Sequence, residues 1–398
     1  MSLYPQFTDL QAVLCCPRSK STLSLMTYSE LLECLPEDER RRVPDGTVGA
    51  FVSESSLTAY PIVGNIADFL EQDSLALSKE GSRKRSIDSE AASIQQSVQK
   101  WYDEFGWRRN ARGMYNDTAL FSQTALTGCG IYELSSHLAF LDRLSSGEFL
   151  LDAASGPLAH PEYLAYSWFY KHRVCIDISS TALFEAQAKV GPKGFCCLAD
   201  ICHLPFRDDV FDAIVSAYTI QHIAESQQLD AIAELYRVLK PGSHLCIVTW
   251  IPHSWAHRSL FFALRAIRKI LNLLSIGRVR PMLHGAQPNT LPSPPQKLYC
   301  CNRDLAWWRT AARNLSCAYS VEGLRLFATE EFEFLFGESV RSARIVRALE
   351  TLFPRLAATM CVYLLVDVVK LPRYETRIPA SRLRETDSIA SRDPANAA

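Results

Sequence analysis

Residues 148–157 read EFLLDAASGP, and this stretch decides the fold. It begins with an apolar run typical of a buried strand and continues with small residues that favour a tight turn. Further short apolar segments follow, and segments with helical spacing separate some of them. The strands are RVCIDIS (173–179), GFCCLADICHLPF (194–206), FDAIVSAYTI (211–220) and HLCIVTW (244–250); the helices are STALFEAQAKV (180–190) and SQQLDAIAELYRVLKPG (226–242). This alternation predicts an α/β fold with a doubly wound, mostly parallel sheet.

Acidic residues follow the first three of these strands, namely Asp152, Asp177 and Asp200. Doubly wound sheets bind ligands at the carboxyl ends of their strands. A carboxylate such as Asp177 can accept hydrogen bonds from both hydroxyls of a ribose. Asp200 with Ile201 can read the edge of an adenine and cover its face. A lone acid after an apolar run is usually a cap or turn former, so the interpretation depends on all three in order.

The segments LLDAASGP, VCIDIS, LADICHLPFRDDVFDAIVSAYTIQHI and LYRVLKPGSHLCIVTW resemble those of Rossmann-like class I methyltransferases, especially the subgroup related to ubiquinone-biosynthesis C-methyltransferases. The resemblance covers roughly residues 98–370 and implies S-adenosylmethionine as the cofactor. The family's first loop usually reads DxGxGxG, but here Ala154 replaces the first glycine, and Pro157 and Leu158 also depart from the pattern. The implied cofactor-binding residues are Asp152, Ala154 and Gly156 for the methionine part, Asp177 for the ribose, Asp200 and Ile201 for the adenine, and also Ile178, Ala217 and Tyr218.

Two further residues are candidates for the same site. His222 follows the fourth strand and is a candidate catalytic base, since a histidine there can take a proton from a nucleophile. The alternative is a histidine at a helix start that only supports the loop. Tyr102, in WYDEFGW (101–107), precedes the sheet. In similar methyltransferases a leading helix folds over the cofactor, so Tyr102 either touches the cofactor or belongs to the plain core.

The N-terminal segments LCCPRSKSTL (14–23) and TAYPIVGNIADFL (58–70) resemble a small zinc-ribbon-like domain that precedes some methyltransferases. That domain usually carries two CxxC pairs. Here Cys16 remains, while Ser19, Ser53 and Ser56 stand at the other positions. Neutral hydroxyls do not replace thiolate ligands of zinc. We therefore expect a degenerate, metal-free domain and predict no metal site.

An insertion after the fifth strand holds the clues to the substrate. Residues 251–303 contain no Asp or Glu but eight Lys or Arg residues. Within them, residues 259–280 have the pattern of a basic amphipathic helix. One interpretation is a lid for an anionic or lipid-like acceptor, with peripheral membrane contact as a further option. The alternative is an ordinary helical cap whose arginines face solvent.

The bulk properties set the remaining expectations. The 398 residues carry a formal net charge of -1, so nothing in the total charge favours nucleic acid as a partner. The 13 cysteines include no CxxC spacing and are expected to be free thiols. No uncharged apolar run reaches the roughly 18–20 residues that a membrane-spanning helix needs. The first residues lack the apolar run of a signal peptide, so the expected location is cytoplasmic.

The sequence thus predicts four segments. They are a degenerate zinc-ribbon-like α+β domain at 1–77, a linker at 78–97, a methyltransferase domain at 98–372 with a helical lid insertion at about 251–345, and a disordered tail at 373–398. The predicted function is methyl transfer to a small-molecule acceptor. The alternative is a cofactor-binding but inactive partner or scaffold protein. The sequence indicates no oligomeric state.

Overall fold

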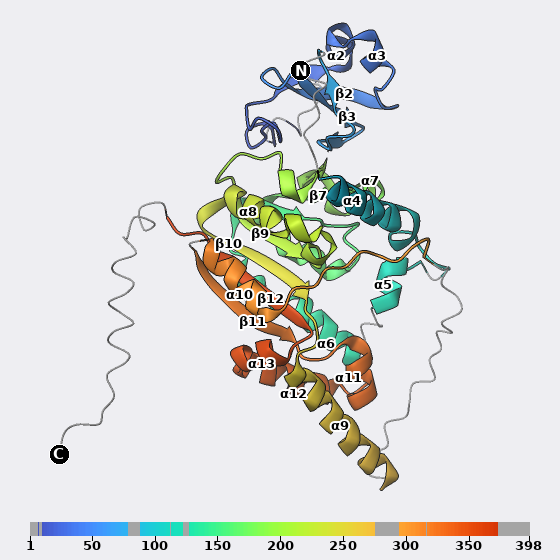
Figure 1. The fold of residues 1–398 in the computed structure, drawn as a ribbon, viewed down its shortest axis with the longest axis vertical. Helices are drawn as coiled ribbons and strands as arrows, with labels where there is room; N and C mark the ends of the chain where they lie inside the picture. Colours follow the sequence, from blue (N-terminus) through green and yellow to red (C-terminus); the bar gives the residue numbers. More distant parts are fainter. Residues whose placement is uncertain are drawn as a thin grey trace, which may run out of the picture.

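The protein forms a continuous twelve-stranded sheet flanked by helices (Figure 1). The computed structural model describes residue 7 and residues 10–78, 88–111, 113–121, 127–274, 294–315 and 317–372. The predicted tail at 373–398 and part of the predicted linker lie outside this set. Among the described residues, no helix is long and apolar enough to cross a membrane.

The predicted parallel strands form the centre of the sheet. They are β6 (Gly147–Ala153), β7 (Tyr170–Asp177), β8 (Gly194–Leu198), β9 (Phe211–Ala217) and β10 (Leu239–Trp250), and their spatial order is β8-β7-β6-β9-β10. All four pairings between these neighbours are parallel. The order reverses between β6 and β9, which places the ligand-binding switch point above these two strands. The predicted doubly wound fold is confirmed.

Two antiparallel strands extend the sheet beyond β10. Strand β12 (Tyr363–Val369) pairs with β10, and β11 (Ala318–Arg325) pairs with β12. Strand β12 is therefore an internal strand, and β11 lies at this edge of the sheet. All residues of β12 except the first and the last are buried, as suits a strand inside a covered sheet.

The helices of the parallel part follow the predicted segments. Helix α7 (Ser180–Val190) begins at a Ser179 cap, whose hydroxyl accepts a hydrogen bond from the Ala182 amide, and ends at Gly191 with φ +63°. Helix α8 (Gln228–Val238) is the second predicted helix. The other helical elements here are α4 (Ser89–Trp101), η1 (Tyr102–Gly106), α5 (Asn116–Phe121), α6 (Gly128–His137), η2 (Leu141–Arg143), η3 (Pro161–Ser167), η4 (Gly191–Lys193), η5 (Ile201–His203), η6 (Ile220–His222) and η7 (Glu225–Gln227).

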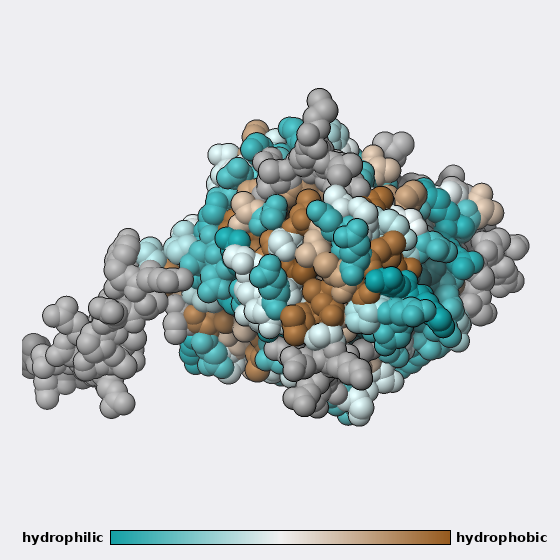
Figure 2. All heavy atoms as spheres, turned by 90° about the horizontal axis from the view of Figure 1, so that it is seen from above, coloured by the Kyte–Doolittle hydropathy of each residue, from teal (hydrophilic) through white to brown (hydrophobic). Residues whose placement is uncertain are grey.

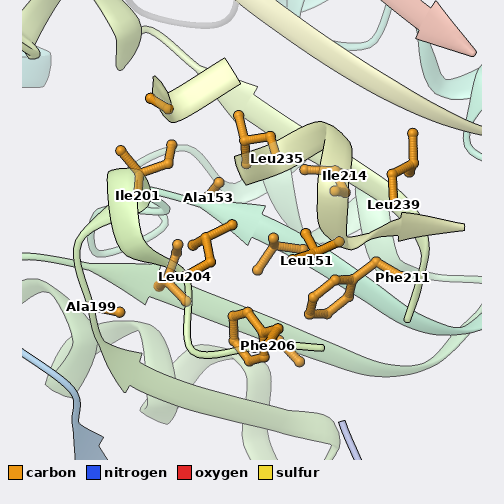
Figure 3. Packing of buried hydrophobic residues seen from close by; sticks show 14 of the residues in the cluster. Leu151, Ala153, Ala199, Ile201, Leu204, Phe206, Phe211, Ile214, Leu235 and Leu239 are labelled. Carbon is orange, nitrogen blue, oxygen red and sulfur yellow. The ribbon is translucent and has the colours of Figure 1, made fainter. Parts of the chain in front are cut away.

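The main hydrophobic core lies between this sheet and its covering helices and loops. Leu151 and Ala153 from β6 pack with Phe211 and Ile214 from β9 and with Leu235 from α8 (Figure 3). Each of these side chains is buried. This packing fixes the position of the end of β6, where the predicted cofactor loop starts.

The N-terminal module (residues 10–78) is built into the same sheet. It contains β1 (Ser24–Thr27), α2 (Tyr28–Cys34), α3 (Glu37–Arg40), β2 (Thr47–Ser53), β3 (Thr58–Val63), β4 (Ile66–Asp68) and β5 (Leu75–Ala76). Strand β4 pairs in parallel with β8, so the module prolongs the central sheet. Seen from above, with the module nearest the viewer, hydrophobic side chains gather in the middle of this face and hydrophilic ones surround them (Figure 2).

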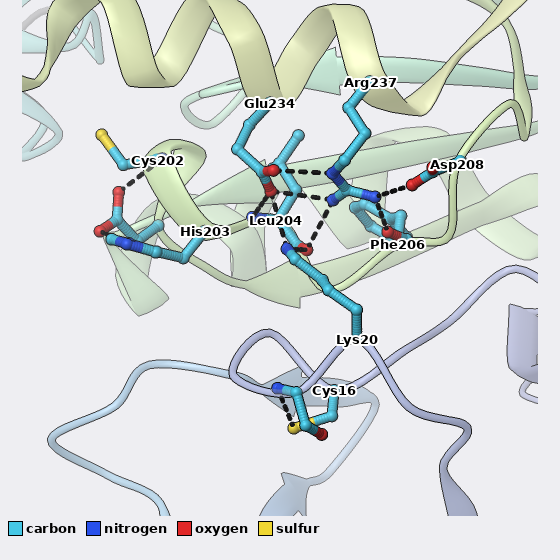
Figure 4. A network of polar contacts seen from close by, with 11 residues as sticks. Cys16, Lys20, Cys202, His203, Leu204, Phe206, Asp208, Glu234 and Arg237 are labelled. Atoms are coloured by element: carbon cyan, nitrogen blue, oxygen red, sulfur yellow. Dashed lines mark hydrogen bonds and ion pairs between the residues drawn. The ribbon is translucent and has the colours of Figure 1, made fainter. Parts of the chain in front are cut away.

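Polar contacts reinforce the junction between the module and the large domain. The Lys20 ammonium donates to the Leu204 carbonyl at 3.1 Å and pairs with Glu234 at 2.9 Å (Figure 4). Arg237 holds the same Glu234 carboxylate and also pairs with Asp208. One lysine of the module is thereby fixed to a network that belongs to α8 and the loop after β8.

The insertion after β10 combines helices with a strand. Its elements are α9 (Trp255–Leu273), α10 (Leu305–Asn314), β11, α11 (Thr329–Phe336) and α12 (Val340–Leu352), with α13 (Pro354–Met360) following. The predicted helical lid insertion at about 251–345 also contains β11, which joins the main sheet. Helix α9 contacts α11 and α13 and extends beyond the body of the molecule (Figure 1).

Candidate functional site

The three strand-end acids lie at one edge of the sheet. Asp152 is near the end of β6, Asp177 is the last residue of β7, and Asp200 follows β8 directly. Because β8, β7 and β6 are neighbours and parallel, their carboxyl ends meet at this edge. The three acids therefore lie at the same edge of the sheet, but the three carboxylates have different surroundings.

Asp177 organises the loop that follows β6. One of its carboxylate oxygens accepts a hydrogen bond from the Gly156 amide at 2.8 Å, and the other accepts from the Ser179 amide at 2.9 Å. Burial raises the pKa of the Asp177 carboxyl to about 6, although these amide hydrogen bonds lower it. A carboxylate offers about four lone-pair positions, so acceptor capacity remains for a further donor such as a ribose hydroxyl.

Asp152 has a buried partner instead. Its carboxylate forms an ion pair with the guanidinium of Arg173, a residue of β7 that is only 1% exposed. The same guanidinium donates to the Tyr163 carbonyl at 2.7 Å. Asp152 therefore supports the base of the loop through Arg173. Its predicted contact with the cofactor stays a prediction.

Asp200 lies where the N-terminal module meets the large domain. Its carboxylate accepts from the Cys202 amide at 2.9 Å and contacts the His203 ring nitrogen at 3.2 Å. Burial raises the pKa of Asp200, but the hydrogen bonds and the charge of His203 outweigh it and lower the pKa below its usual value. Asp200 and His203 line a cavity of about 30 Å³ together with Arg18 and Tyr60 of the module. The module thus forms part of the wall beside the predicted adenine position, and Ile201 lies buried next to it.

The loop after β6 makes a tight turn of alternating backbone conformation. Ala154, Gly156 and Leu158 have φ of +60°, +55° and +51°. L-residues with a side chain occupy this region at a cost of about 1–2 kcal/mol, and glycine avoids that cost. Ala154 stands where the family's pattern has a glycine, and its backbone has a conformation that favours glycine. The alanine therefore carries a conformational cost that a glycine would avoid.

Aromatic side chains from the leading segment lie over this loop. A Cβ on Gly156 would come within 2.9 Å of the Trp107 ring, so only glycine allows this close approach. Tyr102 stacks on Trp107 with ring centroids 4.8 Å apart. Burial raises the pKa of Tyr102, and the nearby carboxylates of Asp117 and Asp177 add to the shift. Tyr102 is thus placed close to the predicted ribose carboxylate.

His222 also contacts Tyr102. The two rings meet edge to face, with centroids 5.9 Å apart. The His222 Nδ1 lies 2.8 Å from the Tyr299 carbonyl, so Nδ1 carries the proton and Nε2 keeps its lone pair. Burial lowers the pKa of His222. A neutral imidazole with a defined tautomer is suited to accept a proton.

The remaining predicted residues surround the same strand ends. Ala217 ends β9, and Tyr218 follows it with φ +59°. The Tyr218 ring points toward Tyr363, with centroids 5.4 Å apart, while its amide donates to the Val248 carbonyl. Ile178 follows Asp177 and is partly buried, and its carbonyl accepts from Gln99 of α4 at 2.8 Å. The leading helix is therefore tied directly to the end of β7.

The four predicted remnants of a zinc-ribbon site also converge. The Cys16 sulfur lies 3.4 Å from the Ser56 hydroxyl and accepts from the Ser19 amide, and the Ser53 hydroxyl accepts from the Ser56 amide. Tyr60, which does not belong to this set, contacts the same sulfur with its hydroxyl at 3.3 Å. Hydrogen bonds therefore connect the thiol of Cys16 with the serines at the other three positions or with their neighbours.

Sequence reasoning missed Trp107 and Arg173 as parts of this site. Arg173 had a visible signal, because a lone arginine inside the apolar strand RVCID requires a buried acidic partner. Trp107 had a weaker one. Its position in WYDEFGW was visible, but only the fold places the ring on Gly156. Its indole Nε1 is buried and has no hydrogen-bond partner among the described residues.

These residues fit an adenosine cofactor with a methionine tail. The Asp177 carboxylate has acceptor capacity for a ribose, and the Asp200 carboxylate for an adenine amino group. The Trp107 indole N–H is an unused buried donor beside Gly156, at the place of the predicted methionine part. Buried polar groups in proteins are rarely left without partners, so an acceptor is expected at this point.

Comparison with known proteins agrees with this geometry. Residues 151–247 match the sequence family described as methyltransferase domain. A tRNA (carboxymethyluridine(34)-5-O)-methyltransferase of Arabidopsis thaliana is 35% identical over 115 residues, covering 28% of this chain and 26% of the relative. A demethylmenaquinone methyltransferase of Streptomyces avermitilis is 28% identical over 120 residues, covering 29% of this chain and 51% of the relative. The chain thus spans about a quarter to a half of the length of these curated relatives.

Solved structures give a weak likeness. Phosphoethanolamine N-methyltransferase 2 of Haemonchus contortus, in complex with S-adenosyl-L-methionine, has a TM-score of 0.37 and 17% identity, covering 63% of this chain and 59% of that one. The strand order and the matched segment are therefore the firmer observations. Together they show that residues 151–247 match a methyltransferase domain and that they form part of a doubly wound, mostly parallel sheet.

Proposed function

We propose that this protein transfers a methyl group from S-adenosylmethionine to a small-molecule acceptor. The observation that carries the proposal is the convergence of Asp152, Asp177 and Asp200 at three neighbouring strand ends, with the Tyr102–Trp107 pair next to the loop after β6. The match of residues 151–247 to a methyltransferase domain supports it. The net charge of -1 favours a small molecule over a nucleic acid as acceptor.

In this proposal the chain's residues bind, orient and exclude water. Asp177 holds the ribose, Asp200 with Ile201 holds the adenine, and Trp107 donates to the methionine carboxylate. The cofactor supplies an activated methyl group on a sulfonium. Alignment of the acceptor with that methyl provides most of the acceleration, because it converts a bimolecular step into an effectively unimolecular one. His222 Nε2 accepts the proton of an acceptor that must lose one.

The acceptor in this proposal is anionic or lipid-like. Helix α9 lies in a segment without acids, and it exposes Phe262, Ile270 and Leu273 beside its basic residues. Such a surface can attract an anion and cover an apolar body. The name of the Streptomyces relative refers to a menaquinone precursor, which is consistent with an apolar acceptor. Peripheral membrane contact through 259–280 belongs to the same proposal, although residues 275–280 lie outside the described part.

Two measurements separate an enzyme from a binding protein. Calorimetry with S-adenosylhomocysteine should show one site per chain. Incubation with a cell extract and a methyl-labelled donor should then transfer label to a small molecule. Binding without transfer would support the inactive partner, an alternative favoured by the strained Ala154 and by the serines at the zinc-ribbon positions. Absence of cofactor binding would contradict both.

A further inference from the structure

The start of the insertion contains a cluster of metal-binding side chains that no part of the proposed methyl transfer uses. His253 precedes α9, His257 lies in its first turn, and Glu331 belongs to α11. One ligand atom from each residue lies within 4.8 Å of the others. We propose that His253, His257 and Glu331 form a binding site for a divalent transition-metal ion of the zinc type, which joins the base of α9 to α11.

The distances are close to those of a coordinated ion. The His257 Nε2 lies 3.1 Å from Glu331 Oε1, and the His253 Nε2 lies 3.9 Å from the same oxygen. Zinc bonds of about 2.0–2.1 Å at tetrahedral angles place two donor atoms about 3.3 Å apart. A small rotation of His253, which is 35% exposed on its side chain, brings its nitrogen to this separation.

Hydrogen bonds already orient two of the ligands from behind. The His257 Nδ1 lies 2.7 Å from the Met360 carbonyl, which fixes a proton on Nδ1 and leaves Nε2 for a metal. The other Glu331 oxygen, Oε2, accepts from the Ala328 amide at 3.0 Å. Metal-binding histidines usually donate their second nitrogen to a carbonyl or carboxylate in this way. The geometry therefore has the supporting contacts as well as the ligands.

A simple ion pair explains only part of the cluster. If His257 is doubly protonated, it pairs with Glu331 and satisfies both of its own nitrogens. The His253 ring then stacks on it at 4.4 Å, and its Nε2 is buried without a hydrogen-bond partner among the described residues. A metal ion gives this nitrogen a partner. Two imidazoles and one carboxylate suit zinc and similar ions, and three protein ligands leave a position open for water.

The site would add a further anchor at the start of α9. Helix α9 contacts α11 and α13 near its start, and its later part extends beyond the body (Figure 1). Ser254 caps the helix and donates to the Thr359 carbonyl at 2.6 Å. A metal bound one residue before and three residues after this cap would hold the first turn in place. This role does not depend on methyl transfer.

The test is a titration of the metal-stripped full-length chain with Zn²⁺. Calorimetry and Co²⁺ visible absorption should detect a site in the wild type. His253→Ala should weaken it at least tenfold, while circular dichroism confirms an unchanged fold. Glu331→Gln should have a similar effect, because the amide keeps the contact with Ala328 but removes the charge. Zn²⁺ should also raise the Tm of the wild type and not that of His253→Ala.

Two controls exclude other sites. His137, His160 and Glu162 form a second group with ligand atoms within 4.8 Å of one another, so His160→Gln should leave the titrated site unchanged. Cys16→Ser should also leave it unchanged, since the N-terminal module has lost its sulfur ligands. If the wild type binds no Zn²⁺, the proposal is wrong and the cluster is only a buried ion pair. Equal binding by wild type and His253→Ala would overturn the proposal as well.

Discussion

At the scale of the residue, Asp177 connects the loop after β6 with the predicted ribose position. Asp177→Ala removes a carboxylate that accepts from Gly156 and has remaining acceptor capacity for a ribose hydroxyl. We expect S-adenosylhomocysteine to bind about 1.5–3 kcal/mol more weakly, the range for hydrogen bonds to a charged group. Calorimetry at pH 7.5 measures this, with Asp208→Ala as a control on the surface. An unchanged affinity would place the ribose elsewhere.

The same residue predicts a pH dependence. Burial raises the pKa of Asp177 to about 6, so the carboxylate is protonated in the folded protein at a higher pH than in an unfolded chain. Below about pH 6 it loses acceptor capacity, and S-adenosylhomocysteine should bind progressively more weakly. The raised pKa also affects folding, but in the opposite direction. The contribution of Asp177 to the stability of the folded state increases as the pH falls, because protonation removes a buried charge. Asp177→Asn should show a flatter binding profile, and identical profiles would assign the titration to another group.

The buried ion pair of Asp152 predicts an effect on the stability of the folded protein. Asp152→Ala leaves the Arg173 guanidinium buried and without its charged partner. Breaking a buried ion pair from one side typically costs about 3–5 kcal/mol. Urea denaturation should therefore show a large decrease in the free energy of unfolding for Asp152→Ala. The decrease should be smaller for the double variant Asp152→Leu/Arg173→Met. A double variant as unstable as the single one would mean that packing, not the unpaired charge, sets the loss.

The residue scale also shows what the sequence could predict. The identity and order of the strand-end acids were visible, because the strands are apolar runs that stop at an acid. The partner of Asp152 was not predicted, since it comes from the neighbouring strand and depends on register. Asp152 faces Cys175 across the β6–β7 pair, which brings Arg173, two residues earlier on the same face, into diagonal reach.

At the scale of the element, the basic residues of α9 allow a test of whether the insertion binds the acceptor. Reversing Arg265, Arg268 and Lys269 to Glu inverts the charge of a segment without acids. We expect a higher KM for the acceptor, which added salt also raises in the wild type, and a nearly unchanged affinity for S-adenosylhomocysteine. Charge reversal of Arg309 and Arg313 on α10 is the matched control. Normal turnover by a folded triple variant would contradict the lid.

Elements differed in how well they could be predicted. The parallel strands and helices α7 and α8 followed the sequence pattern, because burial on both faces gives long apolar runs and helices keep a regular period. Strand β11 was missed. Its sequence AYSVEGLR mixes polar and apolar residues between helical segments, and only pairing with β12 makes it a strand. Short β4 likewise depends on β8, a tertiary contact that no local pattern contains.

At the scale of the whole molecule, the N-terminal module and the large domain share one sheet. Strand β4 pairs with β8 through Ile66, Ala67 and Asp68, and the Cys15 amide donates to the Pro205 carbonyl at 2.9 Å. Buried residues of both parts belong to the same hydrophobic cluster. The resemblance to a separable zinc-ribbon-like domain did not indicate this continuity. The module therefore replaces an exposed sheet edge with a paired one.

This continuity predicts that the molecule unfolds as one unit. Removing residues 1–77 would expose the β8 edge and the apolar side chains that pack on the module, including Phe206. It would also remove Arg18 and Tyr60 from the wall beside Asp200. We expect calorimetry of the full chain to show a single unfolding transition. The truncated chain should melt at a lower temperature, aggregate and bind S-adenosylhomocysteine more weakly.

The variant Lys20→Glu, which breaks only the ion pair with Glu234, is the control. It should lower the temperature of the unfolding transition slightly, and the transition should remain single. Two separate transitions in the full chain, or a truncated chain with wild-type stability and affinity, would show that the module is attached to the methyltransferase domain without supporting it.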